Sequence, residues 1–206
     1  KAVHEAVEAI EPDQLATLIY TSGTTGRPKG VRLTHSSWTY EGAAIQAQNI
    51  LSENDLQFLW LPMAHSFGKV LLSTQLACGF ATAAEGRVDK IIDNLPVVRP
   101  TVMAGPPRIF EKVHGRVIQT MAETGGIRSR LFAWGFGVGA RAATARGEGR
   151  PMGRLLSLEL AVADRLVLAK VRDRLGGRMR FMISGSAALA PGIATWFQTA
   201  GLTVIE

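Results

Sequence analysis

The sequence predicts an α/β fold in which layered, parallel-type sheets are covered by helices. Short apolar runs alternate with longer stretches of helical periodicity along the chain, and this alternation is typical of parallel strands joined by helices. Hydrophobic residues make up 47% and charged residues 19% of the 206 residues, which excludes a disordered chain. A chain of this length can bury one sizeable core.

The first third of the chain predicts two extended segments around a polar loop, then a helix and a further strand. Residues 15–20 form an apolar run that predicts a strand, and residues 31–33 continue as extended chain. Thr34 is a typical N-cap residue for a helix predicted over residues 35–50. Residues 56–61 predict the next strand.

The middle of the chain continues the alternation. Residues 67–77 predict a helix that Gly79 ends, because glycine readily takes the left-handed conformation found after helix C-termini. Residues 80–84 and 101–104 predict short strands, and residues 88–95 predict a short helix between them.

A long helical region follows. Pro106 and Pro107 predict the first turn of a helix, where proline is tolerated. The predicted buried stripe of that helix, spaced by four residues, is Ile109, Val113, Val117 and Met121. After an interruption at Gly125 and Gly126, the remaining predicted elements are a largely helical region over residues 127–175 with a break at 147–153, a strand over 179–183, a helix over 191–199 and a strand over 202–206.

Residues 20–30 form the most informative segment. They contain four serine or threonine hydroxyls, three glycines and Lys29. Glycines let backbone N–H groups approach a ligand closely, and the hydroxyls and ammonium add further donors, so the segment suits a polyphosphate. Because Gly26 is followed by Arg27-Pro28-Lys29, the spacing fits neither the P-loop of NTPases nor the dinucleotide-binding glycine pattern. The alternative is a polar turn between two strands.

The string Tyr-Thr-Ser-Gly-Thr-Thr-Gly-Arg-Pro-Lys-Gly of this segment resembles the signature loop of the adenylate-forming (AMP-binding) superfamily. That superfamily includes acyl-CoA synthetases, luciferases and the adenylation domains of peptide synthetases. A second likeness is Leu-Pro-Met-Ala-His over residues 61–65, which resembles a family element whose histidine lies against the acyl and adenylate site. The alternative for His65 is a structural histidine. Residues 66–69 depart from the pattern of long-chain enzymes, which leaves the substrate length open.

Two further segments resemble the family. Residues 104–113 are similar to the Val-Pro-Arg-x-Phe-Glu-Lys element of long-chain fatty-acid–CoA ligases, with Pro106 in place of the valine. Residues 183–189 resemble the Ser-Gly-Gly-Ala-Pro-Leu loop that lies against adenine, with Ser186 for the second glycine and Ala188 for the proline. A plain turn before a helix is the alternative for this loop.

The resemblance implies that residues 1–206 are part of the large N-terminal domain of a long-chain fatty-acid–CoA ligase, truncated at both ends and without the C-terminal domain. It implies formation of acyl-AMP from a fatty acid and ATP, followed by a thioester with CoA. It implies catalytic roles for Lys29 and His65 and an Mg²⁺ contact for Thr21. The implied ATP site comprises Thr21, Ser22, Gly23, Thr24, Thr25, Gly26, Lys29, Gly185, Ser186 and Ala187.

Two other functions stay open. The protein could pass acyl-AMP to a carrier protein, as fatty-acyl-AMP ligases do, or it could be a degenerate nucleotide-binding module without activity. The resemblance also places a metal-binding Glu, a ribose-binding Asp and a catalytic Lys beyond Glu206. We therefore expect residues 1–206 alone to be inactive.

Charge and cysteine content indicate partners and compartment. Residues 108–180 carry 15 basic and 6 acidic side chains within a chain of net charge +6. This excess indicates either a solvated helical face or contact with anionic membrane. Nucleic acid is disfavoured, because the segment lacks the interleaved aromatic residues used in base stacking. Cys78 is the single cysteine, so no disulfide framework exists and a cytoplasmic location, with or without membrane association, is expected. We interpret Cys78 as a small buried residue rather than a nucleophile.

Overall fold

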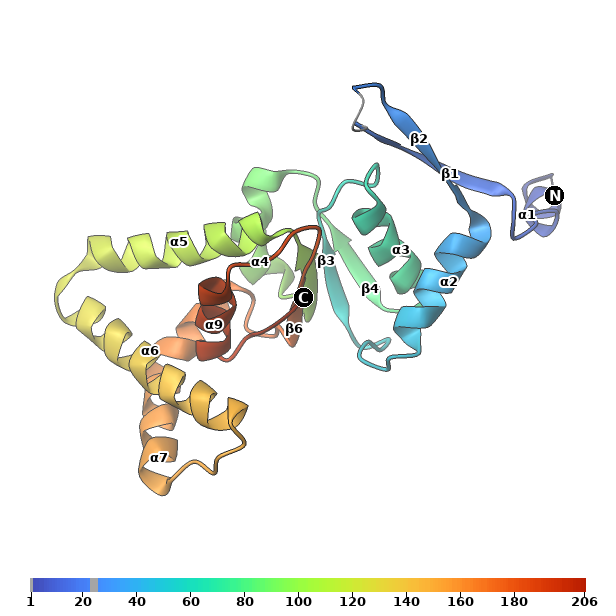
Figure 1. Ribbon diagram of the computed structural model, residues 1–206. Helices are drawn as coiled ribbons and strands as arrows, with labels where there is room; N and C mark the ends of the chain where they lie inside the picture. The colour runs from blue at the N-terminus through green and yellow to red at the C-terminus, as the bar shows by residue number, and fades with distance from the viewer. Residues whose placement is uncertain (1, 23–25) are drawn as a thin grey trace. The chain divides into compact units, whose positions relative to one another are not determined.

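The computed structural model describes residues 2–22 and 26–206. Gly23, Thr24 and Thr25 of the predicted ATP site therefore lie outside the described residues. The chain divides into two compact units, one formed by residues 1–55 and 61–82 and the other by residues 56–60 and 83–206 (Figure 1). Each unit is described by itself.

The first unit combines a β-hairpin with helices. Its elements are α1 (Ala2–Glu8), β1 (Leu15–Thr21), β2 (Lys29–Thr34), α2 (His35–Gln46) and α3 (Ser66–Cys78). The predicted strand over residues 15–20 and the extended segment over 31–33 are both confirmed. They pair antiparallel as a separate two-stranded sheet, because the short loop between them allows a hairpin but no crossover. The sequence did not predict helix α1, which is short and exposed along its whole length.

Helices α2 and α3 pack closely within this unit. A Cβ on Gly42 would lie 2.8 Å from the backbone oxygen of Ser73, so only glycine permits this approach. The predicted N-cap is confirmed, since the Thr34 hydroxyl accepts a hydrogen bond from the Ser37 N–H at 3.4 Å. Helix α2 ends four residues before the predicted boundary at residue 50. The chain leaves the helix through tight turns up to Asn49, which takes a left-handed φ of 55°.

The parallel sheet that the sequence predicts belongs to the second unit, except for the first two residues of its edge strand β4. The five-stranded sheet has the order β4-β3-β5-β6-β7 and consists of β3 (Leu56–Leu59), β4 (Ala81–Ala84), β5 (Val102–Gly105), β6 (Phe181–Ser184) and β7 (Thr203–Ile205). Pairs β3–β5, β5–β6 and β6–β7 are parallel. Strand β3 stops at Leu59, two residues before the predicted end.

Helices cover this sheet, as predicted. The helical elements of the second unit are η1 (Val88–Lys90), α4 (Ile91–Val98), α5 (Pro107–Thr124), α6 (Gly126–Gly147), α7 (Arg154–Ala163), the π-helical turn η2 (Asp164–Leu168), α8 (Ala169–Arg174) and α9 (Pro191–Thr199). Helices α6 and α7 extend away from the sheet (Figure 1). The predicted break over residues 147–153 is confirmed between them, whereas η2 was not predicted.

The core of the second unit lies between the sheet and these helices. Phe58, Met103 and Met182 on three adjacent strands are at most 1% exposed. Phe110 of α5 meets Phe197 of α9 edge to face, with ring centroids 5.8 Å apart. Each such side chain contributes about 1.5–3 kcal/mol when fully buried, and together they fix the loops that follow β5 and β6.

Only half of the stripe predicted on α5 is buried. Ile109 and Val113 lie in the core, whereas Val117 and Met121 are half-buried. The prediction fails for the second pair because an 18-residue helix is about twice as long as a four-residue strand, so α5 runs past the sheet. Over residues 2–22 and 26–206, no helix has both the length and the apolar character required to cross a bilayer.

Candidate functional site

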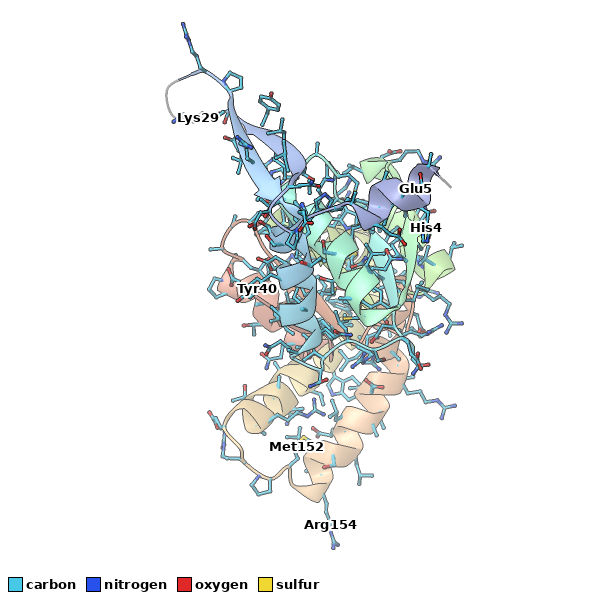
Figure 2. All side chains as sticks on the ribbon, turned by 90° about the vertical axis from the view of Figure 1, so that its right-hand side faces the viewer. His4, Glu5, Lys29, Tyr40, Met152 and Arg154 are labelled. Carbon is cyan, nitrogen blue, oxygen red and sulfur yellow. The ribbon has the colours of Figure 1, made fainter. Side chains whose placement is uncertain are left out.

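The hairpin of the first unit places Thr21 and Lys29 directly opposite each other. They are the last register pair before the loop, and side chains of opposed residues in an antiparallel pair lie on the same face of the sheet. Both residues are exposed, and Lys29 lies at the tip of the hairpin (Figure 2). The hydroxyl and the ammonium group therefore flank the mouth of the donor-rich loop.

The described part of the loop is open to solvent. Ser22 and Gly26 are exposed, and Gly26 has a left-handed φ of 78° that favours glycine. At the neck of the loop, a Cβ on Gly30 would touch the Tyr20 ring at 3.4 Å, so the aromatic ring lies across the glycine. Two glycines thus shape the described backbone on the C-terminal side of the loop, where Gly26 itself is exposed.

His65 lies at the N-terminus of α3, in the same unit as the hairpin. It is the N-cap residue, is exposed, and makes no side-chain capping bond. Its backbone N–H donates to the Pro62 oxygen at 3.0 Å. A Cβ on Gly68 would lie 2.6 Å from the same Pro62 oxygen, so the first turn of α3 packs tightly on the segment that carries His65. The imidazole is free within the described structure while its backbone is held.

The loop after β6 is fastened to the carboxyl edge of the parallel sheet. The Gly185 N–H donates to the Gly105 oxygen at 3.1 Å, which continues the β5–β6 pairing by one residue. Ser186 and Ala187 then become exposed. Ser186 has a φ of 72°, a conformation that favours glycine. The backbone therefore explains why the resembling family motif has glycine at this position.

The same loop is held again at its far end. The Leu189 N–H donates to the Glu206 carboxylate at 3.0 Å, and the Leu189 side chain is only 6% exposed. Residues 185–188 are thus anchored at both ends, and residues 186–188 are exposed between these anchors. Glu206 was predicted only as part of a strand, and nothing in the sequence indicated its hydrogen bond with the Leu189 N–H.

Three further residues at this edge were not singled out for a role. A Cβ on Gly105 would lie 2.5 Å from Cζ2 of Trp60, so the indole packs directly on the glycine. Gly105 pairs in register with Ser184. The Ser184 hydroxyl and the Trp60 indole N–H are buried and have no hydrogen-bond partner among the described residues. In the sequence, the only sign of this packing was Gly105 at the end of a predicted strand.

A tethered carboxylate follows β4 at the same sheet. The Glu85 N–H donates to the Leu59 oxygen at 2.9 Å. The Glu85 carboxylate accepts bonds from Arg87 at 2.9 Å and from Asn94 at 2.6 Å. The Arg87 side-chain and backbone bonds lower the pKa of Glu85 from about 4.5 to about 2. This interaction ties the end of β4 to α4.

The described residues contain no group of three or more His, Cys, Asp or Glu side chains that could hold a metal ion. Thr21 is the residue predicted to contact Mg²⁺, and it supplies one hydroxyl that forms no hydrogen bond within the described part of the chain. A single oxygen ligand fits Mg²⁺, which keeps several waters and takes other ligands from phosphates. Partial burial, with a smaller effect of Asp55, raises the pKa of Cys78, which is consistent with an unreactive thiol.

The predicted site residues fall into two groups. Thr21, Ser22, Gly26, Lys29 and His65 belong to the first unit, and Gly185, Ser186 and Ala187 belong to the second. A groove of about 630 Å³ in the second unit involves neither group and is lined by α4, α5, α6, η2 and α8. None of the predicted site residues lines this groove.

Comparison with known proteins matches the whole chain to one family. The sequence pattern of the family described as AMP-binding enzyme covers residues 1–206. The long-chain-fatty-acid–CoA ligase FadD15 of Mycobacterium tuberculosis is 36% identical over 200 residues, which cover 96% of this chain and 33% of that protein. Fatty acyl-CoA synthetase A of Dictyostelium discoideum is 34% identical over 194 residues, covering 93% of this chain and 27% of that protein.

The fold also has a counterpart among solved structures. The adenylation domain of the carboxylate reductase from Mycobacterium chelonae superposes with a TM-score of 0.64 at 21% identity, covering 94% of this chain and 26% of that one. This likeness shows the α/β fold. The chain spans about a third of the length of its FadD15 relative, or less for the others compared.

Proposed function

Because the chain belongs to the AMP-binding enzyme family, we propose that the intact protein activates a long-chain fatty acid with ATP and transfers the acyl group to CoA. The relatives with this printed activity are 34–36% identical over more than nine-tenths of the chain. The structural observation that carries the proposal is the pairing of Thr21 with Lys29 at the mouth of the donor-rich loop.

The first step is attack of a fatty-acid carboxylate oxygen on the α-phosphorus of ATP. The bond from that phosphorus to the bridging oxygen breaks, and pyrophosphate leaves. Negative charge develops on the phosphoryl oxygens, so fixed N–H donors and a cation stabilise the transition state. In this proposal the Lys29 ammonium and the exposed N–H groups of the loop, including that of Gly26, bind these oxygens.

In the second step the CoA thiol loses its proton to solvent and its sulfur attacks the acyl carbonyl carbon. The bond from that carbon to the phosphate oxygen breaks, and AMP leaves with the oxygen and the electron pair. His65, exposed at the start of α3, would lie against the acyl-adenylate. Gly185, Ser186 and Ala187 would bind adenine through their backbone. Bound Mg²⁺ would neutralise phosphate charge, with the Thr21 hydroxyl as its protein ligand.

The test is pyrophosphate exchange by the intact protein with palmitate, followed by thioester formation with free CoA. We expect both activities. Exchange without thioester, together with accumulation of acyl-AMP, would assign the protein to the fatty-acyl-AMP ligases that use a carrier protein. Absence of exchange and of heat on calorimetric titration with ATP would identify a degenerate module and overturn the proposal.

The compartment and the membrane contact belong to the same proposal. We place the protein in the cytoplasm, supported by a single cysteine and the resulting lack of a disulfide framework. The basic excess of residues 108–180 supports peripheral contact with anionic lipid, where fatty acids partition. Fractionation of cells into cytosol and membrane, with and without a high-salt wash, tests both statements.

A further inference from the structure

The continuous helical segment formed by α7 and η2 has two separate apolar sides. Its inner side, which packs on α6, contains Leu156, Leu160, Ala163 and Val167. Its outer side contains Leu155, Leu158, Val162 and Leu166, which are 73%, 66%, 51% and 40% exposed. These four residues are three or four positions apart and therefore form one stripe along the helix. An apolar stripe on a helix normally faces a partner, and this outer stripe has none among the described residues.

Charge identifies the kind of partner. The outer face of the segment has Arg154 at one end and Arg165 at the other, and its remaining exposed residues are Ser157 and Ala161. Neither arginine forms an ion pair among the described residues. In Figure 2 the Arg154 side chain points away from the helices. The exposed face therefore combines apolar side chains with cations and contains no acid.

Both acidic residues of the segment are neutralised elsewhere. Glu159 is half-buried and pairs with Arg141 of α6. Asp164 pairs with Arg172 of α8 through two bonds of 2.8 Å. No carboxylate of the segment is thus left to repel an anionic partner.

We propose that the outer stripe of α7 and η2 docks on the surface of an anionic membrane. An amphipathic helix in the plane of the interface buries its apolar stripe below the headgroups while arginines extend to lipid phosphates. A second copy of the chain fits less well, because an isologous contact would bring like-charged arginines of both copies together. An anionic membrane would bury the apolar stripe and pair with the two arginines at the same time.

This inference names the surface for the membrane contact suggested above, and it goes beyond the proposed ligase activity. Binding to vesicles needs neither ATP nor fatty acid. An inactive protein that binds vesicles and an active protein that ignores them are therefore distinguishable results.

The test measures co-sedimentation of the intact protein with vesicles of phosphatidylcholine alone or of phosphatidylcholine with phosphatidylglycerol. We expect binding to the anionic vesicles. The double variant Leu158→Ser, Val162→Ser should lower the partition coefficient about tenfold or more, since it removes the two central residues of the four-residue apolar stripe. Val97→Ser is the matched control, because Val97 on α4 is 78% exposed and lies outside the stripe.

A second pair of variants tests the charge. Arg154→Gln, Arg165→Gln should lower binding about tenfold at low salt and less at high salt. Arg178→Gln replaces an exposed arginine outside the segment and should leave binding unchanged. Circular dichroism and thermal melts check that all variants fold.

Accessibility supplies an independent readout. In Leu158→Cys, a water-soluble maleimide located by peptide mass spectrometry should label the introduced thiol in free protein and not in vesicle-bound protein. Three results would overturn the proposal: resistance to labelling without vesicles, equal binding by stripe variants and controls, or loss of self-association instead of vesicle binding in the stripe variants.

Discussion

The two loops proposed to hold ATP are built in opposite ways. The hairpin loop stands on two strands in which Ile19 is the one buried residue, and its site residues are exposed. The loop after β6 is fixed at one end to Gly105 and at the other to Glu206, on top of a buried sheet. The first loop is recognisable from its composition, whereas the second is recognisable from its register and backbone conformation. A loop whose hydrogen-bond donors are exposed for a ligand makes few packing contacts within the protein.

The largest expected effect separates chemistry from stability in the hairpin. Lys29→Ala in the intact protein should lower the rate of pyrophosphate exchange by about 10²–10³, because one charged donor to the transition state is lost. The melting temperature should not change, since Lys29 is exposed and has no ion pair within the described residues. Arg27→Gln, two residues away at the free position of the signature, is the control. Equal losses in both variants would contradict a specific role.

The opposite behaviour is expected at the sheet edge. Gly105→Ala introduces a Cβ that would lie 2.5 Å from Trp60 and 2.9 Å from Ile109. Overpacking of this kind lowers the free energy of unfolding by about 1–3 kcal/mol. Gly115→Ala in α5 meets nothing within 4 Å and should raise stability by about 0.5–1 kcal/mol. Urea unfolding of both variants measures the difference, and equal stabilities would show that Trp60 moves aside freely.

The two loops also differ in how they use left-handed backbone. Ser186→Gly should raise the free energy of unfolding by about 1 kcal/mol, because a non-glycine residue at a φ of 72° is strained. Gly26→Ala introduces that strain into the hairpin, where space is free. Its cost of about 1 kcal/mol should be confined to the hairpin. Hydrogen exchange of the β1 and β2 amides should accelerate while the global melt stays constant. A reversed pattern would mean that the hairpin is the better anchored region.

The smallest effect concerns pH. The Glu85 carboxylate has a pKa of about 2 in the folded protein and roughly 4.3 when unfolded. Its contribution to stability is therefore complete above the unfolded value and is lost as the pH falls through the folded value. Glu85→Gln should remove this acid dependence of the second unit. The hairpin has no such carboxylate pair among its described residues, so its hydrogen exchange should respond equally in both proteins. Melts between these two pKa values provide the measurement.

Much of this architecture follows from local sequence signals. Thr34 predicts the start of α2, Gly79 predicts the end of α3 at a φ of 76°, and Pro107 opens α5 as expected. These signals work because capping and proline geometry depend on a few neighbouring residues. The β5 strand was predicted from a short apolar run, and the β6 strand from the alternation of Met179, Phe181 and Ile183.

The remainder depends on contacts between distant residues. The burial of Val117 depends on how far the sheet extends along α5. The local periodicity of the sequence contains no information about this position. The bond between Glu206 and the Leu189 N–H spans 17 positions. The packing of Trp60 on Gly105 requires the order of the strands. At the candidate site, the sequence therefore predicted the loops but not the residues that hold them.

Because of the π-helical turn η2, the number of residues in this region determines which side of α7 is exposed. A π turn holds one residue more than an α turn, so it shifts the residues before it by about one position relative to those after it. With it, Leu166 faces outward while Val171 and Leu175 of α8 remain buried. Deleting one residue here would rotate α7 by about 100° relative to α8. A homologue that lacks one residue of η2 but is otherwise the same would consequently present a different side of α7 to its surroundings.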